Sequence, residues 1–179
     1  MFKKKAQVWV ETVIYTLIAF LMISLVLFYV KPQIEKTRDK TAIEQSLEVI
    51  KNLDLEILGM NYGDKRTKGI TIKQGKLILN GLEDMIYFEI PSKYQFSELN
   101  KIINDGGISI ITLKTADAYN VKLYKNYTSE STKYNLTVNG VESIRTLNPS
   151  STAYSIQLEN QGLQERGTPN ERIILDITT

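Results

Sequence analysis

One long apolar stretch near the start of the chain constrains the fold more than any other feature. Between Val8 and Val30 only Glu11, Thr12, Thr16 and Ser24 are polar. A helix rises about 1.5 Å per residue, so this stretch reaches roughly 34 Å and exceeds the ~30 Å hydrocarbon core of a bilayer. It is also longer than the apolar part of a secretory signal peptide, and no small-residue cleavage site follows it. The stretch therefore predicts a transmembrane helix.

Basic residues flank the apolar stretch. Residues 3–5 are all lysine, and Lys31 and Pro32 follow on the other side. Lysine and arginine accumulate on the cytoplasmic side of membranes, so the first lysines predict a cytoplasmic N-terminus and an exported C-terminal part. The simplest interpretation is a signal anchor, in which Glu11 lies near the interface and reaches toward water.

A helical pattern continues beyond the apolar stretch. Between charged residues, apolar ones recur at helical spacing, at Ile34, Ile43, Leu47, Ile50 and Ile57. The sequence predicts one helix from Gln7 to about Leu58, with Pro32 as a kink or the start of a new segment. Gly59 and Gly63 are its predicted end. The apolar stripe suits either a coiled-coil seam or a face packed against the rest of the protein.

After Gly69 the apolar residues recur with a period of two, which is typical of strands. "GITIKQGKLILNG" predicts a hairpin that turns at Gln74–Gly75. "DMIYFEIP" places Ile86, Phe88 and Ile90 on one face, whereas "KYQFSELNKIINDGG" suits a short helix or a loop. Further strands are predicted at "ISIITLKT", "YNVKLYKNY", "YNLTVNGV", "ESIRTL", "AYSIQLEN" and "RIILDIT". The predicted fold class is α+β, a long N-terminal helix followed by an antiparallel β-rich head formed by a sheet or a sandwich.

These patterns divide the chain into four parts. They are a basic leader at residues 1–6, a hydrophobic helix at 7–30, its amphipathic continuation at 31–61 and an exported β-rich head at 62–179. The chain has no cysteine and no histidine, which removes disulfides, zinc thiolate sites and the commonest general base. A net charge of +2 is too small to indicate a nucleic-acid surface. The sequence therefore predicts neither an enzyme nor a cofactor.

Three aspartates lie in turn-like contexts, at Asp84, Asp105 and Asp117. Capping of the turn is the expected role of such residues. Calcium is an alternative ligand for turns of this kind, but the chain contains no twelve-residue EF-hand pattern. We therefore predict no metal site.

Tyrosine and asparagine carry two further expectations for the head. The tyrosines suit either an adhesive or subunit-contact surface or, as we favour, half-buried strand positions: Tyr87, Tyr94, Tyr119, Tyr124, Tyr127, Tyr134 and Tyr154. Sequons at Asn126 and Asn135 are candidates for N-glycosylation, whereas proline at position 149 excludes Asn148.

The segment "KKKAQVWVETVIYTLI" resembles the class III signal peptide of archaeal type IV pilin-like proteins. That family has basic residues, a small residue and then Gln-x-Ser-x-Glu at the entry to a hydrophobic helix. Gln7 and Glu11 match the Gln and Glu, and Lys5 and Ala6 match the basic and small positions. Ala6 stands where glycine is more usual, and Trp9 where serine is common.

The resemblance implies a filament subunit. A prepilin-type membrane peptidase would cut between Ala6 and Gln7, and the helix would then leave the membrane lipid for the core of an extracellular filament. The implied partners are identical or related pilin subunits, the peptidase and the pilus assembly machinery, with no nucleic acid. Cutting creates an α-amino group with a reference pKa of about 7.7–8.0, about one helical turn from Glu11.

An amine of a neighbouring subunit would then be the partner of Glu11. At low dielectric such a pair is strongly directional, and an unpaired charge costs several kcal/mol. Glu11 is therefore predicted to set the register between subunits, while the apolar side chains provide nonspecific packing. The alternative is an uncleaved, single-span membrane protein whose extracytoplasmic β-rich domain binds a ligand.

Overall fold

The computed structural model describes residues 2–128, 133–164 and 171–179, and the side chains of residues 2–7 lie outside this description. One α-helix, α1, occupies Phe2–Leu58 and continues through Pro32. It ends at Leu58, as predicted, and the N–H of Gly59 donates to the Leu55 carbonyl at 3.1 Å. By packing, the chain divides into two compact units, Met1–Arg38 and Asp39–Thr179.

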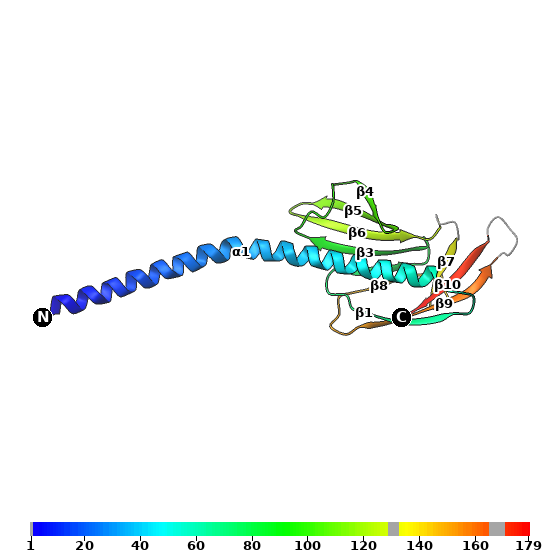
Figure 1. Cartoon of the computed structure of the whole chain (residues 1–179), viewed down its shortest axis with the longest axis horizontal. Helices are drawn as coiled ribbons and strands as arrows, with labels where there is room; N and C mark the ends of the chain where they lie inside the picture. The colour runs from blue at the N-terminus through cyan, green and yellow to red at the C-terminus, as the bar shows by residue number, and fades with distance from the viewer. Residues whose placement is uncertain (1, 129–132, 165–170) are drawn as a thin grey trace. The chain divides into compact units, whose positions relative to one another are not determined.

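The strands all lie in the second unit, which we call the head (Figure 1). Their bounds are β1 Lys65–Ile70, β2 Lys76–Asn80, β3 Met85–Ser92, β4 Ile102–Asp105, β5 Ile108–Thr115, β6 Ala118–Asn126, β7 Tyr134–Val138, β8 Ile144–Leu147, β9 Tyr154–Gln164 and β10 Arg172–Thr178.

The strands form two sheets. The smaller sheet has the order β1-β9-β10-β7, and the larger has the order β4-β5-β6-β3-β2-β8. Neighbouring strands are antiparallel except β7 and β10, which run parallel with Leu136 opposite Leu175. The fold class is therefore α+β, with a long N-terminal helix and a head rich in antiparallel sheet, as predicted.

The hairpin predicted around Gln74–Gly75 is wrong. β1 pairs with β9 in the smaller sheet, whereas β2 pairs with β3 and β8 in the larger sheet. Gly75 does have a positive φ of 75°, so the turn chemistry is present. An added Cβ there would lie 2.4 Å from the Glu89 carbonyl oxygen, because the connection folds closely over β3. Local turn residues thus change the direction of the chain without fixing which strands pair.

Two other segments depart from the expected boundaries. β1 begins at Lys65, before Gly69, after which the strands were expected. The segment "KYQFSELNKIINDGG" is a loop that ends in β4, an edge strand of the larger sheet. Both strands lie at sheet edges and expose most of their side chains, so neither shows the alternation by which the buried strands were found.

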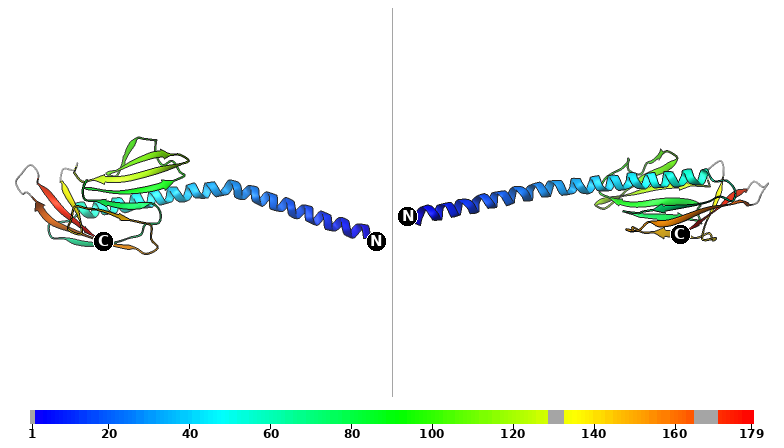
Figure 2. Two further views of the ribbon diagram at one scale, coloured as in Figure 1. Left: turned by 180° about the vertical axis from the view of Figure 1, so that it is seen from behind. Right: turned by 60° about the horizontal axis from the view of Figure 1, so that its bottom comes forward.

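The second half of α1 supplies one side of the core of the head (Figure 2). Ile43, Ile50 and Ile57 are fully buried among apolar residues of both sheets. Ile86, Phe88 and Ile90 of β3 share the buried face, as predicted. The apolar stripe therefore packs against the strands of its own chain from Ile43 onward, and this favours the second of its two interpretations.

Candidate membrane and assembly segment

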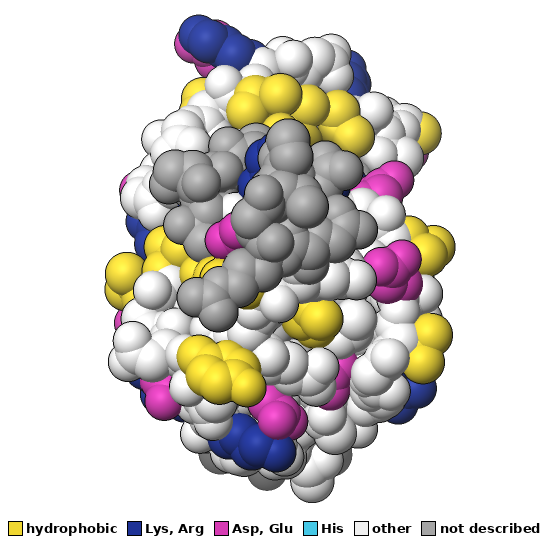
Figure 3. Space-filling view, turned by 90° about the vertical axis from the view of Figure 1, so that its right-hand side faces the viewer, with side chains coloured by type: hydrophobic (Ala, Val, Ile, Leu, Met, Phe, Trp, Pro, Cys, Tyr) yellow, Lys and Arg dark blue, Asp and Glu magenta, His cyan; other side chains and the backbone are white. Residues whose placement is uncertain are grey.

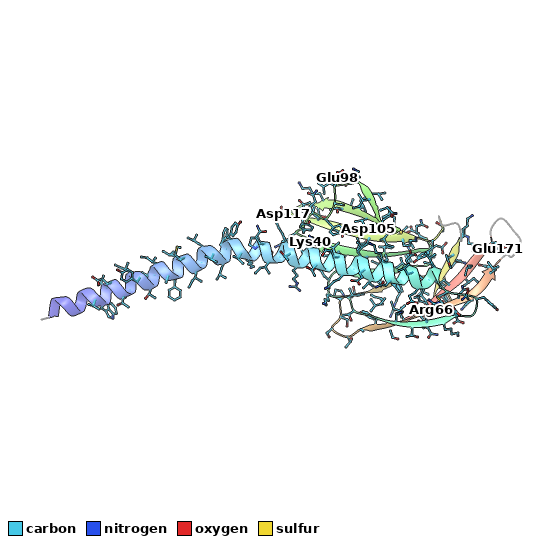
Figure 4. The ribbon with its side chains drawn as sticks, in the orientation of Figure 1. Lys40, Arg66, Glu98, Asp105, Asp117 and Glu171 are labelled. Atoms are coloured by element: carbon cyan, nitrogen blue, oxygen red, sulfur yellow. The ribbon has the colours of Figure 1, made fainter. Side chains whose placement is uncertain are left out.

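The apolar stretch of α1 is exposed on every side of the helix. Phe28 is 85% exposed and Trp9 is 73% exposed, and side chains project in all directions along the part of α1 before Lys40 (Figure 4). The large apolar side chains exposed there are Val8, Trp9, Val10, Val13, Ile14, Tyr15, Leu17, Ile18, Phe20, Leu21, Met22, Ile23, Leu25, Val26, Leu27, Phe28, Tyr29 and Val30. Among the described residues, α1 is the one helix long and apolar enough to cross a membrane.

The threonine and serine hydroxyl groups in this stretch are bonded within the helix itself. Thr12 Oγ1 donates to the Val8 carbonyl at 2.9 Å, and Thr16 Oγ1 donates to the Thr12 carbonyl at 2.8 Å. Ser24 Oγ donates to the Phe20 carbonyl at 2.8 Å. A polar group without a partner is costly in hydrocarbon, so these bonds make the stretch compatible with an apolar surrounding. Apart from the tyrosines, Glu11 is the only ionisable side chain between Val8 and Val30 that an apolar surrounding would have to accommodate.

The predicted leader site lies at the first turns of α1. The side chains of Lys5, Ala6 and Gln7 fall outside the described residues, but their backbone is helical because α1 begins at Phe2. Glu11 is exposed one turn further along the same helix. Peptidases cut extended chains, so cleavage between Ala6 and Gln7 requires the first turns to open, which helix ends do at low cost.

Basic side chains lie on both flanks of the apolar stretch. Residues 3–5 precede it, and Lys31, Lys36 and Arg38 follow it as exposed side chains. The two flanks therefore carry similar numbers of lysine and arginine. The positive-inside rule does not distinguish between them, and the cytoplasmic position of the N-terminus stays a prediction.

A buried ion pair joins α1 to the larger sheet. Lys125 Nζ of β6 lies 3.3 Å from Asp54 Oδ2 of α1, and each side chain is only 7% exposed. Such a pair adds little net stability, but removing one partner leaves a buried charge and is strongly destabilising. The pair therefore ties α1 to β6 at one position along the helix.

A polar cluster holds the last turn of α1. Arg66 of β1 donates to the Gly59 carbonyl at 2.6 Å and to Glu56 Oε2 at 2.8 Å. Lys68 Nζ lies 2.5 Å from the other Glu56 carboxylate oxygen. The pKa of Glu56 is lowered from its ordinary value, mainly by the hydrogen bond from Lys68 and to a smaller extent by the one from Arg66. Because a helix leaves its last carbonyls without partners, Arg66 acts as a side-chain cap that also connects α1 to β1.

Asp39 makes the corresponding contact where the head begins. Its Oδ1 accepts from Gln74 Nε2 at 2.9 Å, and its Oδ2 accepts from the Lys93 backbone N–H at 2.6 Å. Both donors lie in loops next to β3. The part of α1 inside the head is thus held by polar contacts at its two ends and by apolar packing between them.

Asp84 connects the two sheets. It is 5% exposed and has a positive φ of 51° in the turn between β2 and β3. Its carboxylate accepts from the Leu136 N–H of β7 at 2.8 Å and from Arg172 Nη1 of β10 at 3.1 Å. Burial raises the pKa of Asp84 above its ordinary value of 3.8, although the Leu136 N–H and Arg172 act in the opposite direction. Asp84 therefore does more than cap a turn.

The other two aspartates differ from Asp84. Asp105 forms an ion pair with Lys51 at 2.7 Å, and Asp117 is exposed in the turn between β5 and β6. Within residues 2–128, 133–164 and 171–179, the structure brings together no group of three or more residues able to hold a metal ion.

The two sequons lie at different places in the head. Asn126 ends β6, and its Oδ1 accepts from the N–H and hydroxyl of Thr128 at 2.8 and 2.5 Å. Asn135 lies on the edge strand β7, where its amide nitrogen donates to Glu142 at 3.1 Å and to Gln164 at 3.2 Å. Attachment of a glycan to Asn135 would replace one of the two amide hydrogens that make these bonds, and glycosylation of either asparagine stays a prediction.

The seven tyrosines named above lie in strands or close to their ends and are buried or half-buried, whereas Tyr62, in the turn after α1, is 81% exposed. Tyr127 and Tyr134 are buried edge to face with ring centroids 5.8 Å apart, and the Lys122 ammonium lies 4.0 Å from the ring centroid of Tyr87. On the described part of the face in Figure 3, hydrophobic side chains are interspersed with charged and polar ones. These positions agree with a packing role, and an adhesive surface stays a prediction.

Sequence reasoning did not single out Asp54, Lys125 or Arg66. Two of them carry a signal in the pattern. Asp54 follows Ile50 by four positions, which places an acid on the buried face of α1, and Lys125 continues the buried alternation of β6. A charged residue of each sign at buried positions predicts an ion pair. Arg66 gives no such signal, because its role depends on β1 lying beside the end of α1.

The comparisons with known proteins found no matching family model, no matching curated protein and no matching solved structure.

Proposed function

We propose that this protein is a structural subunit of a type IV pilus-like surface filament. In this proposal it is inserted in a membrane through α1, processed by a prepilin-type peptidase and assembled with identical or related subunits. The observation that carries the proposal is the exposed apolar stretch from Val8 to Val30, which directly follows Gln7 and contains Glu11. Such a surface needs an apolar surrounding, and lipid followed by neighbouring helices would supply one.

Glu11 is the residue to which we assign the register between subunits. Its carboxylate lies one turn from Gln7, the residue that would become the N-terminus. In a staggered array of helices, the new α-amino group of one subunit would pair with Glu11 of its neighbour. Because the surrounding side chains are apolar, an unpaired carboxylate would be costly and wrong registers would be rejected.

The first test is the N-terminal residue of the native protein, measured by intact mass and N-terminal sequencing of membrane and surface fractions. We expect a chain that starts at Gln7 and lacks "MFKKKA". A chain that keeps its leader in every fraction would leave Glu11 without the proposed amine partner and would overturn processing.

The second test concerns assembly. We expect Glu11→Ala and Glu11→Gln to abolish incorporation into filaments, as seen by electron microscopy of sheared surface material. Thr16→Ala is the matched control, since Thr16 lies on the same helix and its hydroxyl bonds only within the helix. Normal filament yield from both Glu11 variants would overturn the assigned role.

A hollow in the head favours one alternative, a membrane-anchored ligand-binding domain. Its volume is about 550 Å³, within the usual range of small-ligand sites, and its lining includes Lys76, Glu89, Tyr119, Asn120 and Asn148. Ammonium, carboxylate, amide and phenol groups together suit a ligand rich in hydroxyl groups. This alternative requires the leader to remain on the mature chain, so the N-terminal measurement distinguishes it from the filament subunit.

A further inference from the structure

We infer that α1 binds anionic lipid headgroups through Lys31, Lys36 and Arg38, which we call the basic collar. The inference rests on one part of the proposed function, namely that Val8–Val30 spans a membrane. Lys31 directly follows that stretch, and at about 1.5 Å per residue Lys36 and Arg38 lie roughly 8 and 11 Å further along the helix. Long basic side chains reach back along a helix, so all three charges can lie at the depth of the phosphates.

The basic collar places three positive charges within two turns of α1. All three side chains are exposed, and Glu35 is the one acid between Lys31 and Arg38. Lysines of the head differ, because several have acids at short distances. Lys51 lies 2.7 Å from Asp105, Lys65 lies 2.9 Å from Glu159 and Lys101 lies 2.8 Å from Glu98. Three basic side chains with one acid between them thus lie directly after the apolar stretch.

The positions of the basic collar around the helix fit a helix that crosses a membrane. At 3.6 residues per turn, Lys31 and Arg38 lie within about 20° of each other, and Lys36 lies about 140° away. A helix that lies flat on a membrane keeps its cations on one face. Here the three cations lie on different sides of the helix, and the apolar side chains of Val8–Val30 also surround it. Lipid headgroups on every side of the helix can therefore reach a basic side chain. Arginine also holds a phosphate through two parallel hydrogen bonds, which lysine does not.

A fluorescence experiment on the full chain measures which lipid surrounds this part of α1. Trp9 is the only tryptophan, so Trp9→Phe combined with Ile34→Trp places the single indole next to the basic collar. Ile34 is 62% exposed, and the change does not disturb packing. The protein is reconstituted in vesicles of equal parts phosphatidylglycerol and phosphatidylcholine, with one or the other lipid brominated as the quencher.

We expect brominated phosphatidylglycerol to quench more strongly, with at least a twofold local enrichment, since each basic side chain near an anionic surface is worth about a fivefold preference. Lys31→Gln, Lys36→Gln and Arg38→Gln together should remove the difference. The matched control is Lys73→Gln, Lys114→Gln and Lys133→Gln, which removes the same charge from exposed positions in the head and should preserve the enrichment.

Each other outcome has a defined meaning. Equal quenching by the two lipids overturns the basic collar but leaves membrane insertion intact. Loss of the enrichment in the control triple variant shows that net charge is responsible and also overturns the basic collar. Loss on addition of inorganic phosphate at constant ionic strength assigns the site to free phosphate and overturns the lipid assignment. If neither lipid quenches, Val8–Val30 is not inserted, and both this inference and the membrane part of the proposed function fail.

Discussion

The two halves of α1 have the same secondary structure and opposite surroundings. From Val8 to Val30 the side chains are apolar on every side and exposed. From Asp39 to Leu58 an apolar stripe is buried, and Lys51 and Asp54 form ion pairs with residues of the strands. Both halves have the same helical geometry. The distribution of apolar and charged side chains around the helix therefore decides which surroundings suit each half. The second half is covered by its own chain, whereas the apolar side chains of the first half are exposed and, under the proposed function, would be covered by lipid or by neighbouring subunits.

The largest expected change in the free energy of unfolding comes from a comparison of two carboxylates on α1, Asp54 and Glu11. Asp54→Ala should lower the free energy of unfolding by about 3–5 kcal/mol, because Lys125 would remain buried without its acid. Glu11→Ala should leave the free energy of unfolding unchanged. Urea unfolding of the full chain in detergent, followed by circular dichroism of the strands, measures both.

A double variant tests the cause. Asp54→Leu with Lys125→Met removes both charges, and we expect it to recover most of the lost stability, since replacing a buried pair by apolar residues is often neutral. If the double variant is as unstable as Asp54→Ala, the loss comes from packing and not from the unpaired lysine.

A second comparison uses one residue type in the two halves. Ile50 is fully buried, and Ile50→Ala should cost about 2–5 kcal/mol through the lost contacts and the cavity that remains. Ile23 is 55% exposed, and Ile23→Ala should change the free energy of unfolding by less than about 0.5 kcal/mol. The same unfolding experiment applies. Equal effects would show that the two halves of α1 do not differ in the way described.

A smaller effect is expected at the end of α1. Arg66→Ala removes the donor to the Gly59 carbonyl and to Glu56, so the amides of residues 55–59 should exchange hydrogen faster. The amides of the apolar half should not change. Hydrogen exchange with mass spectrometry checks this. Lys65→Ala is the control, because Lys65 lies next to Arg66 on β1 but pairs with Glu159 of β9 and not with α1. Unchanged exchange at residues 55–59 would contradict the capping role.

The smallest effect is the pH dependence of the head. Because burial raises the pKa of Asp84, the folded state binds its proton more tightly than the unfolded state does. The stability that this adds is present below the ordinary value of 3.8 and is lost as the pH rises through the raised pKa of the folded state. Asp84→Asn should remove this part of the pH dependence of unfolding. If the protein with Asp84 loses more free energy of unfolding toward acid pH than the Asp84→Asn variant does, the ion pair with Arg172 has a larger effect on the pKa of Asp84 than burial has.

Much of the fold could be predicted from the sequence because the relevant signals are local. The apolar stretch, the stripe from Ile43 to Ile57 and the alternation of Ile86, Phe88 and Ile90 each depend on residues close together in the chain. The candidate site is predictable for the same reason. Gln7, Glu11 and the apolar side chains lie on one continuous helix, and no long-range contact is needed to bring them together.

Only the tertiary structure decided which strands pair and which polar residues meet. The sequence correctly predicts a turn at Gly75. The strands on its two sides, β1 and β2, nevertheless belong to different sheets, because pairing depends on distant strands such as β9. Asp84 meets β7 and β10 across the two sheets, and Lys125 meets Asp54 from a strand far along the chain. A short pattern fixes the periodicity and therefore the element. The partner of each element is fixed by burial of the whole core, which no local segment contains.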